Sequence, residues 1–296
     1  MQITLSKYAG FCEGVERAFL MVEKLAQDSK VKKPILVLGE LVHNSEVLVR
    51  LAEMGVGILK PEEPLAEFLQ KNQSKIGTLV ITAHGMGPEI YALAKKLEIN
   101  LVDATCPKVI KVQRLAKHFF QKNFQLVIIG ERQHKEVRGI WQWGSSQAFF
   151  VEKKEDLDKL NLDSKKQIAV LSQTTQNQDF VEFAGKYILK KYPEAQILDS
   201  VCLATHHRQT EIAQLAKENE VVLVLGDSLS SNSKNLFAIA NQLNKNAYFL
   251  QTATQLDPQW FENKKTVAIT AGASTPAWII EEVLTKLKTF NKQWES

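Results

Sequence analysis

Short apolar runs alternate along the chain with segments whose apolar residues recur at helical spacing. Strand-like runs lie at 35–40, 79–85, 126–131, 168–175, 222–227 and 267–273, and amphipathic helical patterns lie at 15–25, 90–97, 109–119, 180–189, 209–217 and 279–287. Runs rich in valine, isoleucine and leucine that alternate with helices are typical of parallel α/β construction. The pattern therefore predicts an α/β fold with parallel sheets.

The same order of elements occurs three times. Each of three cysteines, Cys12, Cys106 and Cys202, ends an apolar run and precedes a helical pattern, and the intervals between them are 94 and 96 residues. A strand-like run ending in Gly-Glu or Gly-Asp follows each helix, and four positions after its glycine comes a polar residue: His43, His134 or Ser230. A further marker falls 44 to 46 residues after that glycine, at His84, Thr174 or Gly272. We therefore expect three similar α/β domains, at 1–104, 105–199 and 200–296.

The repeated markers also predict where a ligand binds. In parallel α/β sheets, ligands bind beyond the carboxyl ends of the strands, where the amino termini of helices also point. All of the markers fall at such ends. If the domains pack around an approximate threefold axis with these ends inward, a pseudo-threefold trefoil brings the three cysteines together.

Three converging thiolates are typical of a metal centre. A lone cysteine is usually a small buried hydrophobe, but repetition at equivalent positions argues against that interpretation. A disulfide would leave one thiol unmatched. Zinc and an iron-sulfur cluster both fit the thiolates, although the clustered spacings of zinc fingers and bacterial ferredoxins are absent. With a four-iron cluster, one iron would lack a protein thiolate and would act as a Lewis acid as well as an electron conduit.

Composition narrows the class of protein. The chain is 45% hydrophobic and 24% charged, which is near ordinary globular usage, and it lacks an apolar stretch of the roughly 18 residues that a membrane span needs. We see no secretory signal, and an odd number of cysteines fits a reducing compartment, so we expect a cytoplasmic protein. The net charge is +4, but the lysine pairs are scattered and lack interleaved aromatic residues, so nucleic-acid binding is not expected.

Polar residues near the predicted strand ends form a candidate anion site. Hydroxyl, amide and imidazole groups beside helix starts suit a phosphate or diphosphate. The candidates are His43, His84, His134, Ser230, Ser231, Asn232 and Ser274. Each also has a structural interpretation, because the serines fit helix caps and a single histidine is often structural. His118, His206 and His207 have no repeat partners, and we interpret them as structural.

Two further residues are candidates for proton transfer. Glu136 lies two residues after His134, and a carboxyl group near a site can be tuned to donate protons. A surface position beside Lys135 and Arg138 fits Glu136 equally well. Thr174 either caps the following helix or passes a proton within the site.

Eight segments of the chain resemble those of the 4-hydroxy-3-methylbut-2-enyl diphosphate reductase family, also called LytB or IspH, whose members catalyse the last step of non-mevalonate isoprenoid synthesis. The resemblance runs in order over essentially the whole chain. One departure is Lys135, where many family members carry proline between the histidine and the glutamate. The segments are Gly10 to Ala18 (GFCEGVERA), Val42 to Asn44 (VHN), Ala83 to Gly85 (AHG), Asp103 to Pro107 (DATCP), Gln173 to Thr175 (QTT), Cys202 to Thr205 (CLAT) with Arg208 and Gln209, Ser230 to Ser233 (SSNS) and Thr270 to Ser274 (TAGAS).

The resemblance implies a function for each set of residues. Cys12, Cys106 and Cys202 would hold one 4Fe-4S cluster, inside a trefoil of three α/β domains. The diphosphate would be held by His43, His84, His134, Ser230, Asn232 and Ser274. The substrate hydroxyl would bind the open iron, and Thr174 and Glu136 would deliver protons. Loss of the hydroxyl as water leaves an allyl species, so isopentenyl and dimethylallyl diphosphate form together.

Two alternatives stay open at this point: a zinc hydrolase or lyase that uses the three cysteines, and a non-catalytic sensor that carries a cluster. For the reductase, electrons must come from outside, since no dinucleotide fingerprint of the G-x-G-x-x-G type follows a strand. A small ferredoxin or flavodoxin is the expected donor. Such donors are usually acidic, and the positive net charge favours their encounter with this chain.

Overall fold

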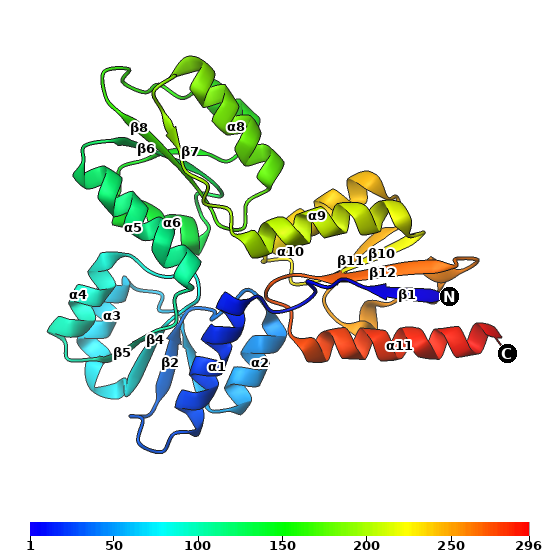
Figure 1. Ribbon diagram of the computed structural model, residues 1–296. Coiled ribbons are helices and arrows are strands. Elements are labelled where there is room, and N and C mark those ends of the chain that lie inside the picture. Colours follow the sequence, from blue (N-terminus) through cyan, green and yellow to red (C-terminus); the bar gives the residue numbers. More distant parts are fainter. Residues whose placement is uncertain (296) are drawn as a thin grey trace. The chain divides into compact units, whose positions relative to one another are not determined.

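The computed structural model describes residues 1–295, and in that range the strands form three four-stranded sheets (Figure 1). The strands are β1 (Gln2–Leu5), β2 (Ile35–Leu38), β3 (Val56–Leu59), β4 (Thr78–Ile81), β5 (Asn100–Asp103), β6 (Gln125–Ile129), β7 (Phe149–Val151), β8 (Ile168–Ser172), β9 (Gln196–Ile197), β10 (Val221–Leu225), β11 (Ala247–Leu250) and β12 (Thr266–Ala271). The α-helices are α1 (Glu13–Gln27), α2 (Ser45–Glu53), α3 (Leu65–Asn72), α4 (Pro88–Lys96), α5 (Pro107–Gln121), α6 (Lys135–Trp143), α7 (Lys154–Asp158), α8 (Gln178–Lys191), α9 (Leu203–Glu218), α10 (Ser231–Leu243) and α11 (Ala277–Glu295).

All three sheets are parallel and share one strand order, which for sheet A is written from the opposite edge. The orders are β1-β12-β10-β11 in sheet A, β3-β2-β4-β5 in sheet B and β7-β6-β8-β9 in sheet C. Every pairing is parallel, as in the pair of Leu225 with Ala271 and the pair of Ile129 with Ser172. The predicted α/β class with three parallel sheets is therefore confirmed.

Strand β1 belongs to the sheet of the last repeat rather than the first. It pairs with β12 in sheet A, and in Figure 1 the blue strand lies beside the orange one. The reason is that the strand before each cysteine completes the sheet of the preceding repeat, as β5 does in sheet B and β9 does in sheet C. The predicted domain boundaries at 104 and 199 fall after β5 and β9, but the predicted start at residue 1 assigns β1 to the wrong sheet. The domain ranges themselves stay a prediction.

Helices cover both faces of each central strand pair, which explains the continuous apolar runs. In sheet C, Val127 and Val170 pack with Ile188 of α8 on one face. On the other face Ile128 and Leu171 pack with α5 and α6. Sheet A has the same construction, with α11 on one face and α9 and α10 on the other.

By their contacts, the residues fall into two units. Unit 1 contains residues 1–13, 43–47 and 202–296, with sheet A, and unit 2 contains residues 14–42 and 48–201, with sheets B and C. Inside unit 2, the indole Nε1 of Trp143 donates a hydrogen bond of 2.9 Å to the carbonyl of Met86, so α6 is joined to the loop after β4. Among the helices of residues 1–295, none is both long and apolar enough to span a membrane.

The predicted helices form, with one start well outside its predicted range. The pattern predicts a helix at 209–217, whereas α9 begins at Leu203, directly after Cys202. The first turns of α9 bury polar side chains, among them Thr205, Arg208 and Gln209, so they carry no apolar periodicity. A helix whose buried face is polar is invisible to a hydrophobic pattern.

Candidate active site

Each cysteine lies at the junction between a strand and the start of a helix. Cys106 is the N-cap residue of α5 and Cys202 is that of α9, and neither thiol makes a capping hydrogen bond. Cys12 directly precedes α1. The partial positive charge at a helix amino terminus favours a nearby thiolate. The three cysteines form no disulfide with one another and are of intermediate exposure, which suits ligands that face a site.

The surroundings of Cys106 fit a bound group. The loop after β4 holds the Cys106 backbone, because its N–H donates to the carbonyl of Ala83 at 3.0 Å. A methyl group on Gly14, in the first turn of α1, would overlap the sulfur of Cys106. Glycine at position 14 therefore leaves space around the sulfur of Cys106, a residue whose backbone is held in place by a hydrogen bond. The donor set and this cleared space fit a cluster held by thiolates.

In unit 1, a buried guanidinium accompanies the other two cysteines. Arg208 on α9 is 4% exposed and donates to the carbonyl of Gly10 at 2.8 Å and to that of Ala204 at 3.0 Å. Burial lowers the pKa of Arg208, and the negative charges of Cys12 and Cys202 oppose that change. The Sγ of Cys202 also lies 3.0 Å from the hydroxyl of Thr205. A cation beside two thiols offsets the negative charge of their thiolate forms.

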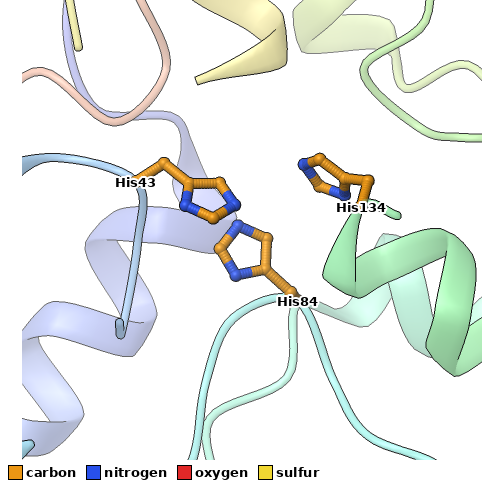
Figure 2. A group of neighbouring side chains, drawn as sticks. All are labelled: His43, His84 and His134. Atoms are coloured by element: carbon orange, nitrogen blue, oxygen red, sulfur yellow. The ribbon is translucent and has the colours of Figure 1, made fainter. Parts of the chain in front are cut away.

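In unit 2, two of the predicted histidines come together. His84 follows β4, and His134 precedes α6; their rings meet edge to face with centroids 5.5 Å apart (Figure 2). His134 is the N-cap residue of α6, and its Nδ1 accepts a hydrogen bond from the backbone N–H of Glu136 at 3.2 Å. In neutral His134 this bond places the hydrogen on Nε2, which leaves that nitrogen as a donor.

The loop that carries His84 packs closely against α5. Gly85 has a φ of +74°, and a Cβ atom there would overlap the amide of Gln113 on α5. Gln113 is 3% exposed, and its amide nitrogen has no hydrogen-bond partner. The sequence pattern did not single out Gln113, because one glutamine inside an amphipathic helix carries no local signal.

Glu136 is a buried acid rather than a surface residue. It is 2% exposed, and its two carboxylate oxygens accept hydrogen bonds from Thr174, from the backbone N–H at 2.6 Å and from the hydroxyl at 3.0 Å. Burial raises the pKa of Glu136 to about 7, although the bonds from Thr174 oppose the change. The alternative of a surface position for Glu136 is therefore wrong, and the predicted pair of Glu136 with Thr174 forms a single hydrogen-bonded unit.

Lys135, the departure from the family pattern, occupies the first position of α6. Its amine lies 3.6 Å from the carboxylate of Glu40, in the loop after β2. Burial lowers the pKa of Lys135. Proline is also favoured at the first position of a helix, so the exchange of lysine for proline leaves the start of α6 intact.

In unit 1, hydroxyl and amide groups gather at the start of α10. Ser230 is the N-cap residue and accepts from the backbone N–H of Ser233 at 3.3 Å, so its interpretation as a helix cap is correct. Its hydroxyl can still donate to a ligand. Asn232 is 3% exposed, and neither atom of its side-chain amide has a hydrogen-bond partner. A buried amide without a hydrogen-bond partner raises the free energy of the folded protein, and such a group is typical of a ligand-binding site.

His43 and Ser274 belong to the same cluster of unit 1. The hydroxyl of Ser274 donates to the backbone carbonyl of His43 at 3.0 Å and lies 3.4 Å from the hydroxyl of Ser230. The hydroxyl of Thr275 donates to the carbonyl of Leu225 at 3.1 Å. Ser231 is 3% exposed in the first turn of α10. Unit 1 thus brings together the predicted residues His43, Ser230 and Ser274.

The comparisons with known proteins decide the family. The family model described as LytB protein matches residues 3–288. The chain belongs to the LytB family. This LytB chain is 35% identical to the 4-hydroxy-3-methylbut-2-enyl diphosphate reductase of Pelobacter propionicus, over 99% of the chain and 100% of the relative. It is 34% identical to the enzyme of the same name from Symbiobacterium thermophilum, over 97% of the chain and 96% of the relative.

A solved structure supports the LytB fold. The E-1-hydroxy-2-methyl-but-2-enyl-4-diphosphate reductase from Plasmodium falciparum superimposes with a TM-score of 0.87 at 31% identity, and the match covers 97% of this chain and 87% of that one. The resemblance inferred from the eight segments is confirmed.

Proposed function

We propose that this LytB chain removes the hydroxyl group of 4-hydroxy-3-methylbut-2-enyl diphosphate by reduction and releases isopentenyl and dimethylallyl diphosphate. The full-length match to reductases of that name carries the proposal. The reaction breaks one C–O bond and consumes two electrons and two protons, of which one leaves with the oxygen as water and the other adds to carbon. The chain must therefore bind a diphosphate, supply protons and receive electrons.

Cys12, Cys106 and Cys202 would hold a 4Fe-4S cluster through their thiolates. Three observations support this assignment: the thiols lie at helix starts, those of Cys106 and Cys202 make no capping bonds, and Gly14 lies beside the sulfur of Cys106. When bound, such a cluster supplies electrons singly and, at the iron without a thiolate, Lewis acidity.

Two sets of polar groups would bind the diphosphate. In unit 1, the set is His43, Ser230, Ser231, Asn232 and Ser274, and in unit 2 it is His84 and His134. The unpaired amide of Asn232 supports the first set, because a ligand oxygen would satisfy its N–H₂ group. The bond from the backbone N–H of Glu136 to Nδ1 of His134 supports the second, because in neutral His134 it places on Nε2 a hydrogen that a phosphate oxygen can accept.

Glu136 would deliver protons to the reacting end of the substrate. A carboxyl group with a pKa of about 7 is a mixture of acid and base at neutral pH, which is the state that a proton donor needs. Thr174 holds both oxygens of Glu136 and offers a hydroxyl through which a proton can pass.

The electrons would come from a small ferredoxin or flavodoxin. We keep the cytoplasmic location expected from the sequence as part of the proposal, because three cysteines that form no disulfide suit a reducing compartment.

Metal analysis tests the proposal most directly. Iron and acid-labile sulfide are measured on anaerobically purified protein, and electron paramagnetic resonance spectra are recorded with and without the diphosphate substrate. We expect about four iron and about four sulfide per chain and a reduced-state signal that the substrate changes. Zinc without iron would support the hydrolase or lyase alternative, and a cluster without electron-dependent turnover would support the sensor.

A further inference from the structure

Helix α5 carries charges of one sign only. Its exposed charged residues are Lys108, Lys111, Arg114 and Lys117, and Lys122 follows directly, while residues 107–122 contain no aspartate or glutamate. Helix α8, of similar length, mixes Asp179 and Glu182 with its lysines. Among the residues that the structure describes, neither Lys111 nor Arg114 forms an ion pair. A helix face with this charge pattern is unusual for a surface that only solvates the protein.

The basic side chains of α5 border a hollow on the outward side of the helix. The hollow is shallow and open, and all of its lining residues belong to α5: Pro107, Ile110, Lys111, Arg114, Leu115 and His118. These residues follow one another at three- and four-residue spacing and therefore share one face. The opposite face, with Val112, Ala116 and Phe119, packs in the core of sheet C and fixes the orientation of α5.

The composition of this face fits a transient protein interface. Ile110 and Leu115 are partly buried apolar residues, and the cations Lys111 and Arg114 lie beside them. An apolar centre with a charged rim is typical of a protein-binding surface. The lining contains no phenylalanine, tyrosine or tryptophan on which nucleic-acid bases could stack, so the charge alone does not favour a nucleic acid.

The position of the hollow identifies the class of partner. Its first residue, Pro107, directly follows Cys106, the N-cap residue of α5 and a ligand of the cluster in the proposed function. An electron carrier that docks on this face brings its redox group to the end of the helix where that ligand lies. The charge of the face selects an acidic carrier and accelerates its encounter.

We propose that the outward face of α5 is the docking surface for the protein that delivers electrons, a small acidic one-electron carrier. The inference rests on the proposed function, because only a reductase needs such a carrier. Lys111 and Arg114 steer the carrier, and Ile110 forms the apolar contact.

The test reverses the charge of this face and compares two electron donors. The variant is Lys111→Glu with Arg114→Glu, and the control is Lys186→Glu with Lys190→Glu on α8, which changes the net charge equally. Turnover of the diphosphate substrate by the holoenzyme is measured with a reduced acidic ferredoxin and, separately, with reduced methyl viologen, a small reductant that needs no docking surface.

We expect kcat/KM for the ferredoxin to fall by about tenfold or more in the α5 variant, since steering changes association rates by about 10- to 1,000-fold. Viologen-driven turnover and the KM for the diphosphate should stay at the wild-type level, and the α8 control should behave like the wild type. Added salt should slow the ferredoxin reaction of the wild type more than that of the α5 variant.

Three results would overturn the docking surface. One is a ferredoxin reaction that the α5 variant leaves unchanged, and another is an equal loss with both donors, which would mean that the substitutions damage the site itself. The third is lost retention on single-stranded DNA with normal ferredoxin kinetics, which would make the face a polyanion surface. A wild-type holoenzyme inactive with viologen as well as ferredoxin would instead refute the reductase function on which the inference rests.

Discussion

Burial decides the chemistry of Glu136 at the scale of the single residue. An exposed glutamate is ionised at neutral pH and cannot donate a proton, whereas this side chain is 2% exposed and its pKa is raised to about 7. The same two bonds from Thr174 that orient the carboxyl group also keep its pKa from rising further. The residue is thereby protonated in part near neutral pH.

We expect Glu136→Gln to lower turnover by about 100-fold or more, since the amide cannot donate a proton in the same way. In the wild type, turnover should fall as the pH rises through about 7, because the acid form disappears. The variant should lack this pH dependence. Steady-state rates between pH 6 and 9 check both points, with iron content as the control for an intact site; wild-type turnover in the variant would exclude Glu136 as the acid.

The same pKa has a consequence for stability. Between the ordinary value of 4.5 and about 7, the folded chain binds the proton of Glu136 and the unfolded chain does not, so the free energy of unfolding falls as the pH rises. The loss is complete above pH 7 and amounts to about 3 kcal/mol at most. Urea denaturation should therefore show the wild type losing more stability from pH 5 to pH 8 than Glu136→Gln does. Equal losses would mean that the carboxyl group is not desolvated.

Asn232 gives a second prediction at this scale. Its unpaired amide is a cost to the folded protein of about 1–3 kcal/mol. Asn232→Leu, a change to an apolar side chain of similar size, should not lower the melting temperature, but it should raise the KM for the diphosphate. Asn44→Leu is the matched control, because Asn44 accepts a bond from the backbone N–H of Val47, and its loss should destabilise the protein. An Asn232→Leu variant with a normal KM would remove Asn232 from the binding set.

At the scale of the element, close approach between two helix starts determines the space around Cys106. The first turn of α1 comes so near to the N-cap residue of α5 that only glycine fits at position 14. Alanine ordinarily stabilises a helix relative to glycine by about 1 kcal/mol. Here the added methyl group would have to displace the sulfur of a proposed ligand.

We therefore expect Gly14→Ala to bind less iron and sulfide than the wild type although every cysteine is still present. Gly185→Ala on α8 is the control, because its methyl group would meet only the side chain of Ile197, at 3.3 Å, and none of the proposed ligands. Iron and sulfide analysis of the two variants, with circular dichroism to verify the fold, checks the prediction. A Gly14→Ala variant with the full metal content would mean that the Cys106 sulfur has room to move.

At the scale of the whole molecule, one strand order occurs three times, in the three four-stranded sheets of residues 1–295. In sheets B and C, the strand before the next cysteine completes the sheet. Sheet A contains the strands of the last repeat and is completed by the first strand of the chain, β1. Residues from both ends therefore lie in one core, with Ile3 packed against the cluster that includes Val283 and Leu287 of α11.

This arrangement predicts that the first strand contributes to the stability of unit 1. Ile3→Ala should lower the free energy of unfolding by about 1–2 kcal/mol, since it removes partly buried apolar area. Leu5→Ala, on the same strand but 43% exposed, should change it by about 0.5 kcal/mol or less. Urea denaturation of both variants is the measurement. Equal effects would mean that β1 is not anchored through the core of sheet A.

Sequence periodicity predicted much of this molecule because it depends on local spacing. Apolar runs and amphipathic segments located the central strands of each sheet, and the repeat placed Cys12, Cys106 and Cys202 at junctions between strands and helices. The start of α9 was missed because its buried residues are polar. The one-sided charge of α5 was present in the sequence, but only the packing of its apolar face shows that the cations point outward.

The sequence by itself determined the fold class, the threefold repeat and the identity of the candidate residues, because these depend on residue types and spacing. Only the tertiary structure decided that Glu136 is buried, that Asn232 lacks partners and that Gly14 lies against Cys106. Burial and close approach depend on which elements pack together, and residues far apart in the chain supply those elements. The strand order of sheet A is the largest example, since the first strand finds its partner more than 260 residues away, at Thr266–Ala271.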